Sequence, residues 1–402
     1  MRLDQRLRQL RGEVQTPAVD AKSALAERLR LLGARKKQPP PNQPADEHAL
    51  ADKLGAERLA PGLLRVERRF NFDVRHGVAR SRDCRVSLPD LMSKPAGHPS
   101  GWLFLDTETS GLAGGTGTWA FLCGLLRFDD RGLLSRQYLL ARLDAERPYL
   151  EAIGDELKTA SLLVTYNGKS FDGPLLTTRL RLAGLALDLV NMRHLDLLHL
   201  VRRAFARVWS DCRLATVEER LLGLRRQGDL PGADAPRAWL DWLRHGQAAS
   251  LAEVLSHNRQ DLLSLPALAG VLAHTLRRPW ALGADVRSVA GYWLDRGQEA
   301  LALAILAQGR EALNETGLLD LARLHRRRSE WSQAHRIWRS LAERDHPGGT
   351  EALTKYLEHR ERDYAQALLW VDRLPAGPDR ERRRQRLEDK LRARAAGSEP
   401  SF

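Results

Sequence analysis

The chain has 402 residues, with 64 Lys and Arg against 51 Asp and Glu, which gives a formal net charge of +13 at pH 7. Its 43% of hydrophobic residues can form ordinary globular cores, but its longest apolar runs are far shorter than the ~20 residues of a membrane-spanning helix. The three cysteines have no paired spacing, which excludes a disulfide framework or a zinc knuckle and is typical of a reducing compartment. We therefore expect a basic cytoplasmic protein with two or three domains and no membrane association.

The first 98 residues are expected to contribute little to the core. Residues 1–60 contain the basic, proline-rich stretch Lys36–Pro44, which cannot bury apolar area, so this segment is expected to be disordered. Residues 61–98 hold two alternating runs typical of edge strands, Leu63–Val66 and Cys84–Leu88. They predict a small strand-containing extension of the domain that follows, and we assign it no function.

Residues 99–280 predict an α/β domain. The expected order is strands 102–105, 119–128 and 133–141, helix 149–159, strand 162–165, helix 174–183, strand 193–197 and helix 198–205. Mostly helical sequence then runs to about residue 275. Three consecutive strands followed by this alternation predict a mixed sheet with helices on its faces.

Residues 286–392 are expected to be entirely helical, followed by a short tail at 393–402. An internal repeat lies within them, since Trp331–Ala334 matches Tyr364–Ala367 at an offset of 33 residues. A period near 34 with an aromatic and then a small residue is the signature of the TPR helix pair. The motif is degenerate, so a plain helical bundle is the alternative. Two or three repeats are few for a free-standing solenoid, which favours packing on the α/β domain.

Two motifs place carboxylates where predicted strands end. Asp106 and Glu108 follow the first apolar strand of the α/β domain. They share one face of that strand, while Thr107 points away. Asp172 follows a later apolar run and precedes a proline by two positions, which predicts a helix start. Ligand sites of open α/β sheets lie at such strand ends, although each motif alone is also typical of a solvated strand end.

A third motif combines an imidazole with a carboxylate. His257 and Asp261 are four residues apart in helical sequence and so lie on one helix face, where a salt-bridge or capping pair is the ordinary interpretation. With the first two motifs they make a set of four carboxylates and one imidazole. Four carboxylates in one pocket repel each other by several kcal/mol at low dielectric. Divalent cations relieve this repulsion, and an all-oxygen ligand set favours Mg²⁺ or Mn²⁺.

These motifs resemble the DEDD superfamily of 3′–5′ exonucleases, and more closely the YprB-type RNase H-like proteins, from about Gly101 to Ala273. The stretches that carry the resemblance are 105–112, the glycine-rich 114–117, 166–172 and 257–265. The resemblance implies an RNase H-like fold in which two metal ions are held by Asp106, Glu108, Asp172 and Asp261. Histidine-type members of the superfamily place the histidine five residues before the last aspartate. Here His257 is four before it, the spacing at which the other subclass carries tyrosine, so its role as a base is left open.

Three further residues are candidate contacts for nucleic acid. A basic surface attracts polyanions and releases their counterions, although arginine-rich composition also occurs in proteins that bind nothing acidic. By the resemblance, Leu112 would pack against a terminal base, and Asn167 lies in the shared approach to Asp172. Lys169 is a candidate contact for a phosphate, with an exposed loop lysine as the equal alternative. Asp196 lies near a predicted strand end, where a helix N-cap is the simpler interpretation.

The sequence therefore predicts a metal-dependent nuclease, and foremost a 3′–5′ exonuclease that hydrolyses DNA or RNA from a single-stranded end with two Mg²⁺ or Mn²⁺ ions. His257 would accept the proton of the attacking water. A structure-specific endonuclease is one alternative, because the RNase H-like fold serves both activities. A non-catalytic nucleic-acid-binding or scaffold protein is the other. The TPR-like repeats are expected to offer a surface to a protein partner.

Overall fold

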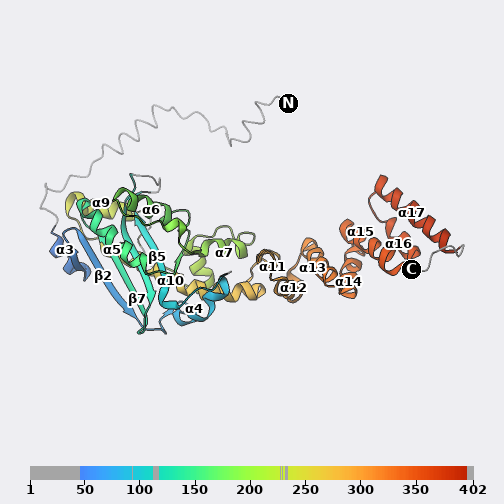
Figure 1. The fold of residues 1–402 in the computed structure, drawn as a ribbon, viewed down its shortest axis with the longest axis horizontal. Helices are drawn as coiled ribbons and strands as arrows, with labels where there is room; N and C mark the ends of the chain where they lie inside the picture. The colour runs from blue at the N-terminus through green and yellow to red at the C-terminus, as the bar shows by residue number, and fades with distance from the viewer. Residues whose placement is uncertain are drawn as a thin grey trace, which may run out of the picture.

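The structure is a computed structural model that describes residues 46–92, 94–111, 117–226, 228, 230 and 234–395. In Figure 1 an α/β domain occupies one end of an elongated molecule, and an array of helices runs from it toward the C-terminus. Within the described ranges no helix combines the length and the apolar character needed to cross a bilayer. The predicted mixed sheet with flanking helices and the helical C-terminal region are both present.

The α/β domain is built on a 7-stranded sheet. In spatial order its strands are β1 (Glu57–Ala60), β2 (Leu63–Phe70), β7 (Leu133–Leu140), β6 (Ala120–Phe128), β5 (Trp102–Thr109), β8 (Leu162–Thr165) and β9 (His194–Asp196). Neighbours from β1 to β5 are antiparallel, whereas β5, β8 and β9 run parallel. The carboxyl ends of β5 and β8 therefore lie at the same edge of the sheet. A separate small pair, β3 (Arg75–His76) and β4 (Ala79–Arg80), lies outside it.

Helices cover both faces of this sheet. They are α3 (Glu47–Leu54), α4 (Ser81–Ser87), α5 (Glu146–Lys158), α6 (Asp172–Leu182), α7 (Leu197–Phe205), α8 (Leu214–Val217), α9 (Ala235–His245) and α10 (Leu251–Arg277). Trp102 and Phe104 of β5 belong to a core shared with α4, α7 and the C-terminal half of α10. Leu103 and Leu105 belong to a second core shared with α3, α5, α6 and α9. The apolar run in β5 is continuous because both of its faces are covered.

Part of the segment expected to be disordered forms regular structure. Residues 46–60 form the capped helix α3 and strand β1, whereas residues 1–45 lie outside the described residues. Asp46 is the N-cap of α3, and Leu50 and Leu54 are buried in the second core. The expectation of disorder was therefore wrong between 46 and 60, because an amphipathic, capped segment follows the proline-rich stretch.

The expected small extension at residues 61–98 is instead divided between the sheet and a helix. Strand β2 pairs along its whole length with β7, so it is an inner strand of the sheet. The run Cys84–Leu88, predicted as an edge strand, lies in α4 and the 3₁₀ turn that follows it. Strand alternation would bury Val86 together with Cys84 and Leu88. The helix buries the two residues four apart and leaves Val86 80% exposed, so helical spacing explains the burial.

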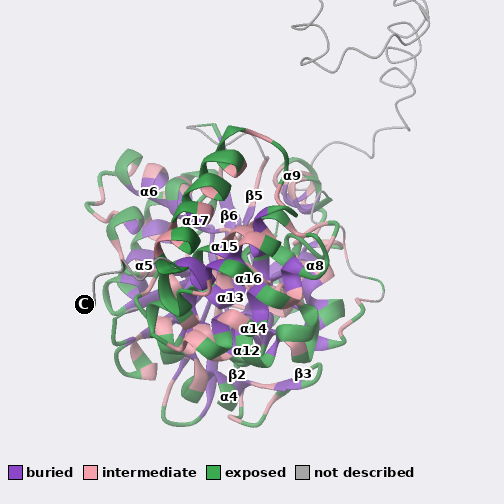
Figure 2. Ribbon diagram, turned by 90° about the vertical axis from the view of Figure 1, so that its right-hand side faces the viewer, coloured by how far each residue is buried: buried purple, intermediate pink, exposed green. Residues whose placement is uncertain are grey.

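The C-terminal array consists of consecutive helices that pack on their neighbours. They are α11 (Val286–Leu294), α12 (Glu299–Gln308), α13 (Glu315–Arg327), α14 (Trp331–Ala342), α15 (Pro347–Tyr356), α16 (Tyr364–Val371) and α17 (Pro378–Ala395). The internal repeat coincides with helix starts, because Trp331 begins α14 and Tyr364 begins α16. Ala334 and Ala367 are fully buried at matching positions. Figure 2 looks toward the array and shows exposed residues along its outer helices.

The array is joined to the α/β domain by buried polar contacts. The indole of Trp293 donates to the Leu276 carbonyl at 2.7 Å, and the hydroxyl of Tyr292 donates to the Leu91 carbonyl at 3.1 Å. Residues of α11 and α12 lie in the same core as α7 and α10. The array is therefore continuous with the α/β domain at its first helix.

Candidate active site

The parallel pairing of β5 and β8 brings the first two motifs to one edge of the sheet. Asp106 lies opposite Gly124 in the ladder between β5 and β6. Beyond β8 the chain turns and enters α6, whose first residue is Asp172. Asp106 is partly exposed, whereas Glu108 and Asp172 are buried. Buried carboxylates require polar partners. The groups that hold this site in place come from the turn after β8, from helix α10 and from β5 itself.

The turn between β8 and α6 is fixed by Asp196. Its carboxylate accepts hydrogen bonds from the backbone amides of Asn167 at 2.7 Å and Lys169 at 3.0 Å. It also accepts from the amide of Leu198 at 3.0 Å, as the N-cap of α7. Asn167 has a φ of 68°, a left-handed conformation that is uncommon outside glycine. Asp196 therefore shapes the turn that leads to Asp172.

Helix α10 approaches Asp106 from one face of the sheet through a fully buried Asn258. The amide of Asn258 donates to Oδ2 of Asp106 at 2.8 Å and to its backbone carbonyl at 3.2 Å. Gln137 of β7 in turn donates to Oδ1 of Asn258 at 2.8 Å. Neither amide was predicted to have a role, because a single Asn or Gln carries no spacing signal of its own.

The close approach of α10 depends on Gly124. A Cβ atom at this position would lie 2.2 Å from Oδ1 of Asn258 and 2.6 Å from a methyl group of Leu262. Glycine is therefore required here because it lets the helix backbone and the Asn258 amide come close to the strand.

We expect Gly124→Ala to destabilise the protein by about 1–3 kcal/mol, the usual cost of overpacking a core. The added methyl group must displace Asn258, which removes the hydrogen bond to Asp106. Urea unfolding would measure the change, with Gly377→Ala as the matched control because a Cβ atom added at Gly377 would meet nothing within 4 Å. Equal midpoints for the wild type and Gly124→Ala would contradict this account.

Asp172 approaches the strand end from the opposite face. Thr107 points away from Asp106 and Glu108, and its hydroxyl donates a hydrogen bond to Oδ1 of Asp172. Sequence patterns alone predicted no function for Thr107. Burial raises the pKa of Asp172 to about 6, against the opposing effect of the Thr107 hydrogen bond. Asp172 thus carries an ionised carboxylate at neutral pH at a cost in stability.

The carboxylates at this edge influence one another. Burial raises the pKa of Asp106 well above its usual range, and the nearby charges of Asp261, Asp172 and Glu108 raise it further. Burial likewise raises the pKa of Asp261, although the guanidinium of Arg226 opposes that rise. Mutual repulsion of this kind shows that the carboxylates of all three motifs lie within electrostatic range of Asp106.

Arg226 is a component of the site that was not predicted from the sequence. Its guanidinium forms an ion pair with Asp261 and a bidentate pair with the buried Glu218, both of whose bonds are 2.7 Å long. Its Nη1 also lies 3.2 Å from Nδ1 of His257. Arg226 lies in the irregular segment that follows the helical turn Glu218–Leu222 and reaches the site only through tertiary folding, so spacing could not have identified it.

The contact with Arg226 selects a tautomer of His257. A guanidinium can only donate hydrogen bonds, so Nδ1 of His257 is the acceptor and the ring proton of the neutral form lies on Nε2. That Nε2 lies 3.7 Å from Asp261 and 4.0 Å from Glu108. In this arrangement Nε2 cannot accept a proton from water until Arg226 releases the ring.

The carboxylates fit divalent cations in type but do not form a closed ligand set. In the parts of the chain that the structure describes, no group of three or more Asp, Glu, His or Cys side chains is arranged to hold a metal ion. Thr107 occupies an oxygen of Asp172, and Arg226 occupies an oxygen of Asp261. Carboxylate oxygens are nevertheless the ligands that Mg²⁺ and Mn²⁺ prefer. A cation would also relieve the repulsion that raises the pKa of Asp106.

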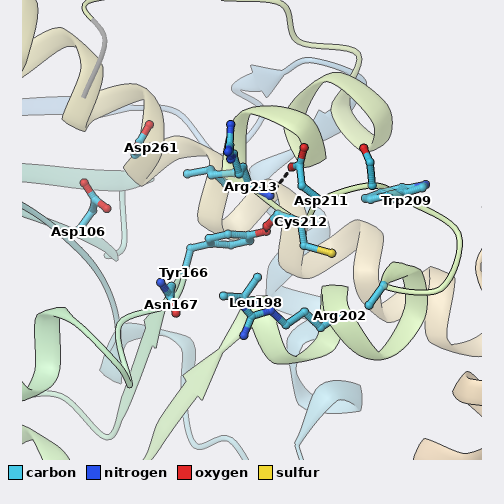
Figure 3. Close-up of a pocket in the computed structure, with 13 residues that line it drawn as sticks. Asp106, Tyr166, Asn167, Leu198, Arg202, Trp209, Asp211, Cys212, Arg213 and Asp261 are labelled. Carbon is cyan, nitrogen blue, oxygen red and sulfur yellow. Dashed lines mark hydrogen bonds between the residues drawn. The ribbon is translucent and has the colours of Figure 1, made fainter. Parts of the chain in front are cut away.

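An open cleft of ≈ 650 Å³ lies in front of Asp106 and Asp261. Figure 3 shows these two carboxylates near each other at one end of it, with Tyr166 and Asn167 farther along. The side-chain amide of Asn167 forms no hydrogen bond with the described residues, so it is available to a ligand in the cleft.

Lys169, a second candidate nucleic-acid contact, does not line this cleft. Lys169 is exposed and lines a separate cavity of ≈ 340 Å³ together with His194. Leu112 lies outside the described residues. Of the three candidates, Asn167 is therefore the one that the structure places beside Asp106.

Comparison with known proteins adds a family to this geometry. Residues 103–273 match the model of the RNase_H superfamily, and the mixed sheet with flanking helices fits an RNase H-like fold. YprB of Bacillus subtilis (strain 168), an uncharacterized protein, is 30% identical over 295 residues, which cover 70% of each chain. A family B DNA polymerase from the hyperthermophilic archaeon Pyrobaculum calidifontis is 16% identical with a TM-score of 0.33. That match covers 56% of this chain but 29% of the polymerase chain.

Proposed function

The chain belongs to the YprB family and carries an RNase H-like domain, and from this premise we propose that it is a metal-dependent nuclease. We propose further that it is a 3′–5′ exonuclease of the DEDD type, which hydrolyses phosphodiester bonds of DNA or RNA. The observation that carries the proposal is the meeting of carboxylates from β5, α6 and α10 at one sheet edge. Burial and the repulsion of these carboxylates raise the pKa of Asp106, and Asp106 and Asp261 line an open cleft.

In this proposal the carboxylates would hold two Mg²⁺ or Mn²⁺ ions, which when bound stabilise the attacking and leaving oxygens of an in-line displacement. The ligands would be Asp106, Glu108, Asp172 and Asp261. Asn258 orients Asp106, and Thr107 orients Asp172. Arg226 neutralises Asp261 in the structure and would have to release it when a cation binds.

His257 would accept the proton of the attacking water, and Arg226 has a second role in that step. Release of the His257 ring by Arg226 allows the ring proton to move to Nδ1 and frees Nε2 as an acceptor. One movement of Arg226 would therefore prepare both Asp261 and His257. Asn167 would contact the nucleic acid in the cleft, and Leu112 and Lys169 remain proposed contacts.

End-labelled linear and circular single-stranded oligonucleotides with Mn²⁺ test the proposal. A ladder of stepwise products from the 3′ end and intact circles are expected for the exonuclease. Cut circles would identify a structure-specific endonuclease. Binding without any cleavage would identify a non-catalytic nucleic-acid-binding protein, the alternative that the contact of Arg226 with Asp261 favours.

We also propose that the helical array is TPR-like and binds a protein partner. The support is the repeat of 33 residues, whose two copies begin α14 and α16 with an aromatic residue and bury a small residue three positions later. The chemistry is confined to the α/β domain in this proposal.

A further inference from the structure

The cleft in front of the carboxylates has a basic and aromatic wall. Arg202 belongs to α7, and Trp209 and Arg213 belong to the turn that joins α7 to α8. We call these three residues the α7 wall. In the view of Figure 3 the two arginines lie on either side of the Tyr166 ring, and the carboxylates lie at the end of the cleft.

The positive charges of the α7 wall are only partly balanced, because the carboxylate of Asp211 lies close enough to Arg213 to interact with its charge. Arg202 and Arg213 are exposed, and neither forms a salt bridge with any carboxylate in the described part of the chain. Arg203, the next residue on α7, is by contrast paired with Asp295 at 2.9 Å. Of the three carboxylates that line the cleft, Asp211 is the one beside the wall in sequence, and it accepts a hydrogen bond from the backbone amide of Arg213 at 2.9 Å. The wall therefore attracts an anionic ligand.

The aromatic rings of the cleft are held by their own contacts. The hydroxyl of Tyr166 donates to the Cys212 carbonyl at 2.5 Å. Trp209 stacks on Phe205 with ring centroids 3.9 Å apart and an interplanar angle of 11°, and the guanidinium of Arg220 lies over the same ring, 5.1 Å from its centroid. Ordered rings beside arginines are the features by which proteins bind single-stranded nucleic acid. Bases of a duplex have both faces covered by stacked neighbours, so this wall favours an unpaired strand.

We infer that the α7 wall binds the phosphates of a single-stranded nucleic acid and guides its end to Asp106 and Asp261. The inference rests on the proposed nuclease function and names the surface that binds its single-stranded substrate. It also assigns Arg202 and Arg213 as positioning residues, because they would act on the strand and not on the reacting phosphate.

The test compares two variants in which arginine is replaced by glutamine on or next to α7. Arg202→Gln/Arg213→Gln removes the wall arginines, and Arg203→Gln removes the paired arginine as the matched control. Binding of a fluorescent single-stranded oligonucleotide is measured in EDTA at several salt concentrations, followed by steady-state cleavage with Mn²⁺. A thermal melt checks that both variants remain folded.

The double variant is expected to bind the single strand at least about tenfold more weakly at low salt. Its slope of log affinity against log salt should become shallower by about 0.7 for each phosphate that the arginines no longer neutralise. The KM for the oligonucleotide should rise with little change in kcat. Arg202→Lys/Arg213→Lys, which keeps the charge, should recover most of the salt slope. Arg203→Gln should match the wild type.

Three results would overturn the inference. One is a double variant whose affinity and salt slope equal those of Arg203→Gln. Another is a duplex that binds as tightly as the single strand. The third is a wild-type protein that binds neither. A wild-type protein that binds the strand through the wall but never cleaves it would instead support the inference and refute the proposed nuclease function.

Discussion

Asp172→Asn is expected to abolish Mn²⁺-dependent hydrolysis and, in metal-free buffer, to raise the melting temperature of the protein. The loss of activity should exceed about 10³-fold, the upper end of what removal of one charge-stabilising group costs. Asp106→Asn should behave in the same way. Asn has nearly the same shape as Asp. At position 172 its side-chain oxygen can still accept the hydrogen bond from Thr107.

The stability gain follows from the raised pKa of the carboxylate. Burial raises the pKa of Asp172 to about 6 in the folded protein, above the ~3.9 of an unfolded Asp. The folded state therefore binds the proton more tightly. The free energy of unfolding falls as the pH rises through this interval, by about 3 kcal/mol. Asn carries no charge and avoids this loss.

Melting curves in EDTA between pH 4 and pH 8 would measure the effect. The difference in melting temperature between Asp172→Asn and the wild type should be largest above about pH 7 and should vanish near pH 4. Asp155→Asn is the control, because Asp155 is exposed on α5 and pairs with Lys158. It should leave both cleavage and the melting profile unchanged. Near wild-type cleavage by Asp172→Asn, with contaminating nuclease excluded, would remove the central proposal.

Local patterns predicted the elements whose burial is set by their own sequence. The run 162–165 was predicted as a strand and is β8, since a short apolar run between polar turns has few alternatives. The run Cys84–Leu88 was wrongly predicted as a strand, because its pattern is compatible with more than one structure. Residues at even spacing can satisfy a strand, but the first and last of them are also four apart, and tertiary packing selected the helix.

The site likewise contains residues that the local sequence could identify and one that it could not. Asp106, Glu108 and Asp172 could be proposed from sequence, because strand ends and helix starts are locally encoded. Arg226 could not, because its partners Asp261 and Glu218 are brought to it only by the path of α10 and the turn after α8. A buried ion pair of this kind leaves no periodic signal. Arg226 matters to the chemistry through a different contact, because its Nη1 donates to Nδ1 of His257 and so sets the tautomer of the candidate base.

His257→Ala is expected to lower kcat by roughly 10²–10⁴-fold if His257 accepts the proton of the attacking water. Removal of the ring leaves Arg226 with Glu218 and Asp261 as partners, so the melting temperature should change little. Added imidazole should restore part of the lost rate, which a purely structural role would not allow. His274→Ala is the matched control, because His274 is exposed on the same helix, and its kcat should equal that of the wild type.

Measuring kcat and stability of Arg226→Gln, alone and combined with His257→Ala, tests the role of Arg226. Arg226→Gln should lower the free energy of unfolding, since it leaves the buried Glu218 without its ion-pair partner. It should nevertheless retain the dependence of kcat on His257, so that His257→Ala lowers the rate in either background. Unchanged turnover of His257→Ala at pH 8, with the protein folded, would assign proton acceptance to solvent. Lys169 is not an alternative acceptor, because it lines a different cavity from Asp106 and Asp261.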